Sequence, residues 1–79
     1  MNNPKITLDQ WSALVAVVEA GGYAQASARL HRTQSTVTYT IKKLEELLGV
    51  RAFELQGRRA VLTPVGQVLY RRGKALLEE

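Results

Sequence analysis

The sequence contains no cysteine and a single histidine, His31. The absence of cysteine excludes a disulfide scaffold and any thiolate zinc finger. One imidazole leaves no histidine-based metal cluster, so we expect neither a metal nor a cofactor. No apolar run approaches the ~18 residues that a membrane span needs, and the N-terminus lacks the apolar core of a signal peptide. We therefore expect a cytoplasmic protein that makes no membrane contact.

Residues suited to catalysis are also few. Asp9, His31 and the serines do not have the spacing of a nucleophile, a base and an orienting group. Glu45 and Glu46 are neighbours, and neighbouring helix positions point about 100° apart, so we interpret them as surface or ion-pair residues. A chain of 79 residues also leaves little room for a substrate pocket. The sequence predicts a protein that is not an enzyme.

Positive charge, in contrast, is abundant and clustered. Lys and Arg number 11 against 7 Asp and Glu, which gives a formal net charge of +4. The stretches 21–44 and 56–77 contain basic residues and no acid, whereas acids occur in 1–20, 45–55 and 78–79. Two acid-free stretches can fold into one electropositive face, which suits a polyanionic partner. The alternative is solvated charge that only keeps the domain soluble.

Hydrophobic spacing predicts helices in the first part of the chain. After a loose arm at residues 1–6, Thr7 and Gln10 fit a capping box, and the helix that follows stops at Gly21-Gly22. A short alanine-rich helix is expected over about 23–30. Trp11 of the first helix is interpreted as a core residue. It belongs to an apolar row that recurs at steps of three and four: Leu8, Trp11, Leu14, Val15 and Val18.

A third helix is expected from Gln34 to about Leu48, with Thr33 as its N-cap and Gly49 after its last turn. Opposite its apolar row, the first half of this helix offers hydroxyls, an amide, a phenol and two ammonium groups, with no carboxylate before Glu45. A helix in the major groove of DNA needs such groups, because uncharged donors and acceptors contact base edges and cations contact phosphates. The pattern therefore predicts a DNA-reading helix.

A hairpin and a last helix complete the prediction. Residues 52–55 and 60–62 have strand character, and the turn over 56–59 contains a glycine and two arginines, as in a DNA-contacting wing. Thr63-Pro64 marks the start of a helix that runs towards Glu79. It carries two glycines, which suggest either close packing or a helix end that frays. Its two apolar rows exceed what one small domain can bury, so one row is expected to remain for a second copy.

Several runs of sequence carry a family resemblance. They are GYAQASARLHRTQSTVT at 22–38, IKKLEELLGV at 41–50, Phe53-Glu54, Arg58-Arg59 and LTPVG at 62–66. Over about residues 8–77, the chain resembles the N-terminal DNA-binding domain of LysR-type transcriptional regulators. The resemblance implies an α+β, mostly helical fold: a winged helix-turn-helix with a C-terminal linker helix.

The resemblance also implies an organisation and partners. Residues 1–63 would form the winged helix-turn-helix, and residues 64–79 the start of a linker and dimerisation helix. We expect an excised piece of a longer regulator, whose effector-binding domain, absent here, would bind a small molecule. The partners expected are double-stranded DNA with an interrupted inverted-repeat operator and a second copy in a homodimer. The family often has arginine where this chain has Tyr39 and Leu55, and proline where it has Ser35. These departures leave the operator sequence open.

The residues expected to contact DNA are drawn from the third helix and the hairpin. Base-edge candidates are Gln34, Ser35, Thr38 and Tyr39; phosphate candidates are Arg32, Thr33, Lys42 and Lys43; wing candidates for the backbone or minor groove are Arg58 and Arg59. The resemblance and the apolar rows assign dimerisation to Val65, Leu69, Tyr70, Gly73, Leu76 and Leu77.

Two other interpretations were weighed. The DNA-binding domain of a molybdate-responsive regulator has a similar winged helix, although the RLH…TQS and LEELLGV runs argue against it. A protein-interaction module can also use this fold, although an acid-free basic face argues against that function. Salt-dependent DNA binding distinguishes the second alternative.

Overall fold

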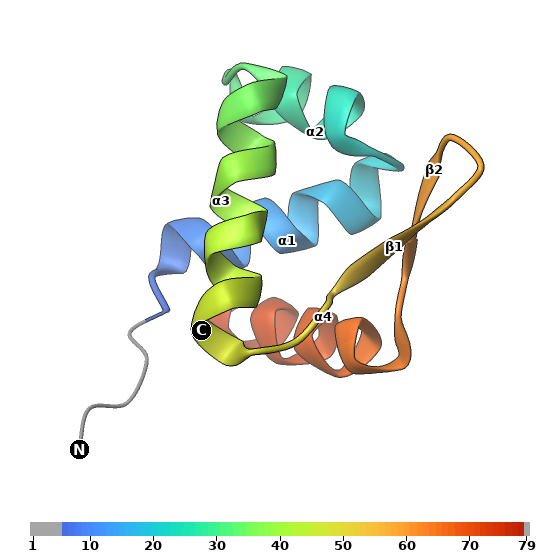
Figure 1. Ribbon diagram of the computed structural model, residues 1–79. Helices are drawn as coiled ribbons and strands as arrows, with labels where there is room; N and C mark the ends of the chain where they lie inside the picture. The colour runs from blue at the N-terminus through green and yellow to red at the C-terminus, as the bar shows by residue number, and fades with distance from the viewer. Residues whose placement is uncertain (1–5, 79) are drawn as a thin grey trace.

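The computed structural model describes residues 6–78 (Figure 1). This part of the chain forms four helices and one antiparallel hairpin. In order they are α1 (Leu8–Ala20), α2 (Tyr23–Leu30), α3 (Gln34–Leu48), β1 (Phe53–Gln56), β2 (Arg59–Leu62) and α4 (Pro64–Leu77). The α+β, mostly helical fold and the predicted order of elements are confirmed. None of the helices in this described part is both long and apolar enough to cross a membrane.

The helix boundaries follow from their caps. Thr7 Oγ1 accepts a hydrogen bond from the Gln10 N–H at 3.1 Å, and Gln10 Oε1 accepts one from the Thr7 N–H at 2.9 Å, so the capping box is confirmed. Thr33 and Thr63 cap α3 and α4 with their hydroxyl oxygens, which accept hydrogen bonds from the N–H groups of Thr36 and Gly66. Of the loose arm predicted at residues 1–6, residues 1–5 lie outside the described part, whereas Ile6 packs against the core.

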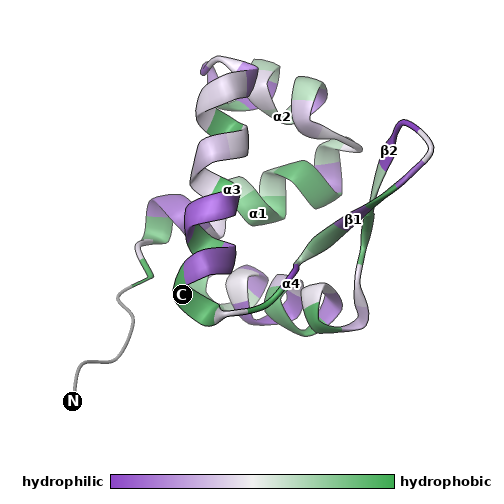
Figure 2. Cartoon of the chain, in the orientation of Figure 1, coloured by the Kyte–Doolittle hydropathy of each residue, from purple (hydrophilic) through white to green (hydrophobic). Residues whose placement is uncertain are grey.

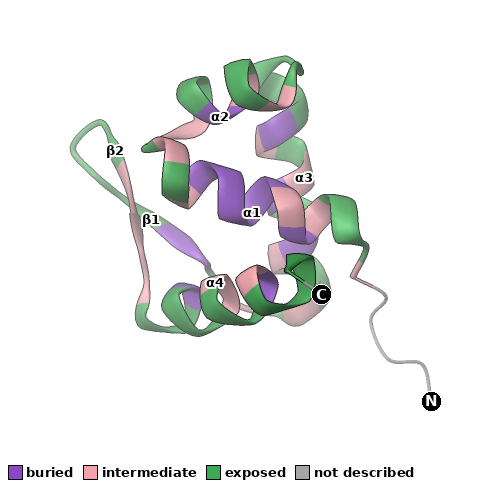
Figure 3. Cartoon of the chain, turned by 180° about the vertical axis from the view of Figure 1, so that it is seen from behind, coloured by how far each residue is buried: buried purple, intermediate pink, exposed green. Residues whose placement is uncertain are grey.

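The core is built around α1, which contacts α2, α3 and α4. Figure 3 shows the middle of this helix buried, and the buried residues include Trp11, Leu14 and Val17. Leu8 belongs to the apolar row of this helix but is 63% exposed. Side chains tilt towards the N-terminus of their helix, so the first residue projects beyond the turn that the neighbouring helices cover.

The turn of the hairpin is shorter than the sequence predicts. β1 and β2 pair from Phe53 with Leu62 to Gln56 with Arg59, which leaves only Gly57 and Arg58 in the turn. Arg59 is therefore a strand residue and not a turn residue. Gly57 has φ +66°, the left-handed conformation that a two-residue hairpin turn accommodates best with glycine.

The two glycines of α4 allow close packing, as predicted, and both are buried. A Cβ on Gly66 would overlap the carbonyl oxygen of Ala52, and a Cβ on Gly73 would lie 3.0 Å from Trp11 Cε3 and 3.2 Å from Val15 Cγ2. α4 thus lies directly against the base of the hairpin and against α1. The position of the hairpin and the direction of α4 are consequently linked.

Candidate nucleic-acid interface

The base-edge candidates share one hollow on the surface of α3. Gln34, Ser35, Thr38 and Tyr39 line it together with Lys42. On the opposite side of the helix, Val37, Ile41 and Leu44 are buried in the core. The Tyr39 side chain is 64% exposed, so its aromatic ring is not part of the core. The helix is therefore held by its apolar row, and the residues that line its hollow include no carboxylate.

The phosphate candidates differ in what already engages them. The Arg32 guanidinium makes a two-point contact with the Asp9 carboxylate at 3.0 and 2.9 Å. Lys43 lies 3.5 Å from a Glu46 carboxylate oxygen. The Thr33 hydroxyl accepts from the Thr36 N–H and donates to the Thr36 hydroxyl. Exposed ion pairs contribute little free energy, so they restrain the Arg32 and Lys43 side chains only weakly.

Lys42 differs from these residues because it has no ion pair with any carboxylate of residues 6–78. It lines the α3 hollow and also a second one at the end of that helix. Its ammonium group is therefore available to an anion on this side of α3.

The arginines of the hairpin lie beside the start of α3. Arg58 and Arg59 are exposed, and Figure 2 shows the tip of the hairpin as hydrophilic. Both line a hollow between the hairpin and the start of α2, which also includes Gln34 and contains no carboxylate. The hairpin and the start of α3 thus contribute to one concave surface.

Glu45 connects α3 to the base of the hairpin. Its Oε2 accepts hydrogen bonds from the backbone N–H of Ala52 at 2.7 Å and of Phe53 at 3.3 Å. The interpretation of Glu45 as a surface or ion-pair residue is therefore wrong, whereas that of Glu46, which pairs with Lys43, is confirmed. A glutamate one turn before a helix-ending glycine, followed by a strand, is the sequence signal for such a contact.

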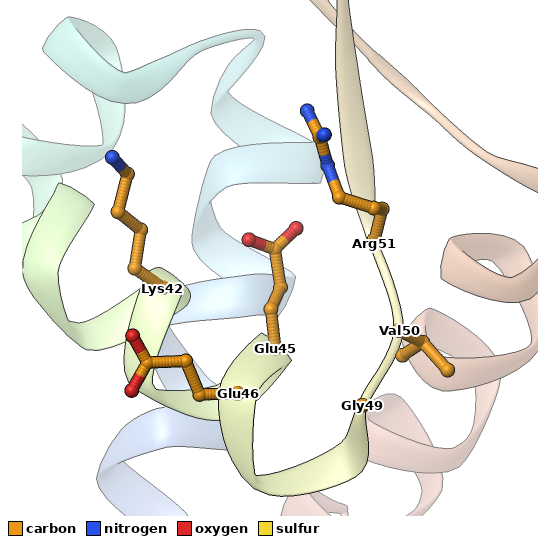
Figure 4. A pocket seen from close by; sticks show the side chains of 6 residues that line it. All are labelled: Lys42, Glu45, Glu46, Gly49, Val50 and Arg51. Atoms are coloured by element: carbon orange, nitrogen blue, oxygen red, sulfur yellow. The ribbon is translucent and has the colours of Figure 1, made fainter.

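Arg51 is a cation that the sequence analysis did not select. Figure 4 shows its side chain and that of Lys42 on either side of the Glu45 carboxylate, while Glu46 points elsewhere. Arg51 is exposed and has no ion pair with a carboxylate in the described part of the chain. Arg51 lies in the stretch 45–55, which contains three glutamates, so counting charges along the sequence does not identify it as an available cation.

Tyr23 joins α2 to the hairpin. Its ring meets the Phe53 ring edge-on, with centroids 5.8 Å apart and planes at 61°. Burial, followed by the charge of Glu45, raises the pKa of the Tyr23 phenol to about 12. The phenol therefore stays protonated at neutral pH.

The dimerisation candidates on α4 separate into two groups. Gly73 is buried against α1, and the Tyr70 hydroxyl donates to Glu19 Oε2 at 2.8 Å. Hydrogen bonds from Lys74 and then Tyr70 hold the pKa of the Glu19 carboxyl below its usual value. Val65, Leu76 and Leu77 are exposed and Leu69 is partly buried, while Val68, which was not among the candidates, is also exposed.

The chain matches a family model described as bacterial regulatory helix-turn-helix protein, lysR family, over residues 8–67. It is 40% identical to the probable HTH-type transcriptional regulator YhaJ of Escherichia coli K12 over 73 residues, which cover 92% of this chain and 24% of YhaJ. The chain spans about a quarter of the length of the curated relatives YhaJ, YeeY and YeiE.

Two solved structures are similar throughout the fold. The BenM DNA-binding domain in complex with catB site 1 DNA is 32% identical, with a TM-score of 0.87 over 91% of this chain and 81% of that one. CbnR, a LysR family transcriptional regulator, is 35% identical, with a TM-score of 0.86 over 91% of this chain and 25% of that one.

The role of Glu45 is tested by Glu45→Ala. The variant leaves two backbone N–H groups without their acceptor, so the free energy of unfolding should fall by about 1–3 kcal/mol in urea denaturation. Hydrogen exchange at Ala52 and Phe53 should accelerate. Glu46→Ala is the matched control and should change stability by less than about 0.5 kcal/mol, because its ion pair is exposed. Equal stabilities of the two variants would contradict the anchoring role.

Proposed function

The chain belongs to the lysR family of bacterial regulatory helix-turn-helix proteins, and from this premise we propose that it binds double-stranded DNA sequence-specifically, with α3 in the major groove. The observation that carries the proposal is the carboxylate-free hollow on α3, backed by a buried apolar row. The likeness to the BenM domain, whose structure contains DNA, supports it. The lysR family match sets aside the molybdate-responsive alternative.

In the proposed complex, α2 crosses the DNA backbone while the Gln34 end of α3 contacts base edges. Ser35, Thr38 and Tyr39 extend that contact along the helix. Lys42 contributes an unpaired cation to a phosphate. Arg32 keeps guanidinium donors beyond the two that face Asp9, so it can serve a phosphate while Asp9 orients it.

Lys43 and Thr33 are less suited to contact a phosphate. Glu46 faces the lysine, and the hydroxyl of Thr33 already caps α3. Arg58 and Arg59 are proposed to contact the backbone or the minor groove, since the hairpin tip flanks the start of α3. The wing therefore extends the contact surface beyond the major groove.

We also propose a homodimer through α4. The exposed row formed by Val65, Val68, Leu69 and Leu76 provides apolar surface for a second copy. A two-fold pairing would place two copies of α3 on one DNA face, with half-sites about one helical turn or a multiple apart, in an interrupted inverted repeat. Control by a small-molecule effector would reside in sequence outside this chain.

The role of Gln34 is tested by Gln34→Ala on an operator selected from random DNA with the purified domain. If the amide contacts an adenine with two hydrogen bonds, binding to that operator should weaken by about 1–3 kcal/mol, with little change on random DNA. Gln67→Ala, an exposed glutamine on α4, is the control and should bind as wild type. Equal losses on both DNAs would reduce Gln34 to a positioning contact.

Salt dependence separates DNA binding from the protein-interaction alternative. The logarithm of the association constant should fall linearly with the logarithm of the salt concentration, with a slope of ~0.9 per phosphate neutralised. Titrations between about 50 and 200 mM salt cover the range where this loss is large. DNA affinity that stayed constant over the range would favour a protein partner instead.

The dimer is tested by Val68→Glu, which places a charge on the exposed row without entering the core. Two copies should then bind a two-half-site operator less cooperatively, while binding to a single half-site stays unchanged. Gln67→Glu adds the same charge on a neighbouring face of α4 and is the matched control. Gel-shift titrations measure the cooperativity, and an unaffected Val68→Glu would place the dimer contact elsewhere.

A further inference from the structure

Two hollows meet at the hairpin and share three residues that carry no charge. Tyr23, Leu55 and Ala60 line both hollows, and we call them the shared strip. The first hollow continues towards α3 and includes Lys42 and Arg51. The second continues towards the start of α2 and the hairpin tip, and includes Gln34, Arg58 and Arg59. The strip is therefore apolar surface between two groups of cations.

Leu55 is the unexpected member of this strip. Its side chain is 73% exposed, the largest value among the exposed large hydrophobic residues of the described chain. Alternation along β1 places it on the same face as the buried Phe53, and it pairs with Ala60 across the hairpin. It thus extends the inward face of the hairpin beyond the edge of the core, towards the surface that α3 presents.

The Tyr23 ring, which lies beside Leu55 in the strip, is restrained by its packing. Tyr23 is half-buried and packs edge-on against Phe53. Contact with an aromatic neighbour in the core restricts the ring, so little side-chain entropy remains to be lost when another molecule packs on it. The strip is accordingly suited to van der Waals contact.

The charges around the strip favour a polyanion. Lys42, Arg51, Arg58 and Arg59 have no ion pair among residues 6–78. The carboxylates at the first hollow are Glu45, which is engaged by two backbone N–H groups, and Glu54, which alternation places on the other face of β1. A nucleic-acid strand has the matching pattern, because its charged phosphates are separated by uncharged sugars.

We propose that the shared strip packs against deoxyribose of one DNA strand, with Lys42 and Arg51 at a phosphate on one side and Arg58 and Arg59 at phosphates on the other. The proposal rests on the proposed function and adds Tyr23, Arg51 and Leu55 to the interface. Every nucleotide carries the same sugar, so this contact strengthens binding to all sequences and does not select among them.

Leu55→Ala tests the strip. It should weaken binding about 5- to 10-fold on the selected operator and on random DNA alike, the size expected when most of the apolar surface of a leucine is no longer buried. The salt slope should not change, because an apolar contact releases no counterions. Arg51→Ala should instead reduce the slope by about one.

Leu8→Ala is the matched control, since Leu8 is also an exposed leucine but lies at the start of α1. It should bind DNA within about twofold of wild type, as expected of a side chain outside the contact. Leu55→Thr keeps a residue that favours strands and should weaken binding in the same direction, so a loss with both variants is not due to a weakened hairpin. Thermal melting monitored by circular dichroism verifies that all variants are folded.

Three results would overturn the proposal: wild-type affinity of Leu55→Ala, equal losses for Leu8→Ala and Leu55→Ala, or a loss confined to the operator. A loss confined to the operator would indicate that Leu55 contacts a base, for example through the methyl group of thymine. If Gln34→Ala and the salt titration behave as expected while Leu55→Ala binds normally, only this inference fails. If wild type does not bind DNA, the proposed function itself fails.

Discussion

The backbone N–H and carbonyl group of Ala52 hold α3, the hairpin and α4 in one arrangement. Its N–H donates to the Glu45 carboxylate at 2.7 Å, and its carbonyl oxygen accepts from the Thr63 N–H at 3.0 Å. Gly66 lies against the same carbonyl, and the Ala52 side chain is fully buried. An isolated two-stranded hairpin is at best marginally stable in water, so the direction of this wing depends on its base. The backbone contacts of Ala52 fix α3 and the hairpin relative to each other, and thereby form the concave surface between them.

The same constraint involves α4, which carries the exposed apolar row. At one end α4 is capped by Thr63, whose hydroxyl also donates to the Arg51 carbonyl at 2.5 Å; further along it is joined to α1 by Glu19. Because hydrogen bonding lowers the pKa of Glu19 in the folded state, this contact stabilises the fold above the ordinary carboxyl pKa. The contribution is lost as the pH falls through the lowered value. At neutral pH, therefore, α4 is joined both to α1 and to the base of the hairpin. A second copy bound to α4 and DNA bound at the hairpin would contact parts of the fold that are held together.

Local rules predicted the helices well, and tertiary contacts explain what they missed. Caps depend on neighbours in sequence, so Thr7, Thr33 and Thr63 marked the helix starts correctly, and the helical repeat placed Tyr39 on the exposed face. The roles of Glu45 and Arg51 depend on the path of the chain after α3. The spacing of residues within a helix gives no information about that path. Leu8 fits the apolar repeat but is exposed at the start of α1. The first strand was predicted one residue too early and the second one residue too short, because pairing continues up to a two-residue turn.

Folding also separates the charges in a way that composition does not show. Asp9 faces Arg32, Glu19 faces Lys74, and Glu46 faces Lys43, so these carboxylates are occupied by cations away from the hairpin tip or at the far end of α3. The Glu45 carboxylate is engaged by backbone N–H groups instead of a cation. The cations beside α3 and the hairpin, Lys42, Arg51, Arg58 and Arg59, consequently form no ion pair among residues 6–78. The formal net charge of +4 therefore understates the positive potential of this one surface, and it is the surface potential that attracts a polyanion.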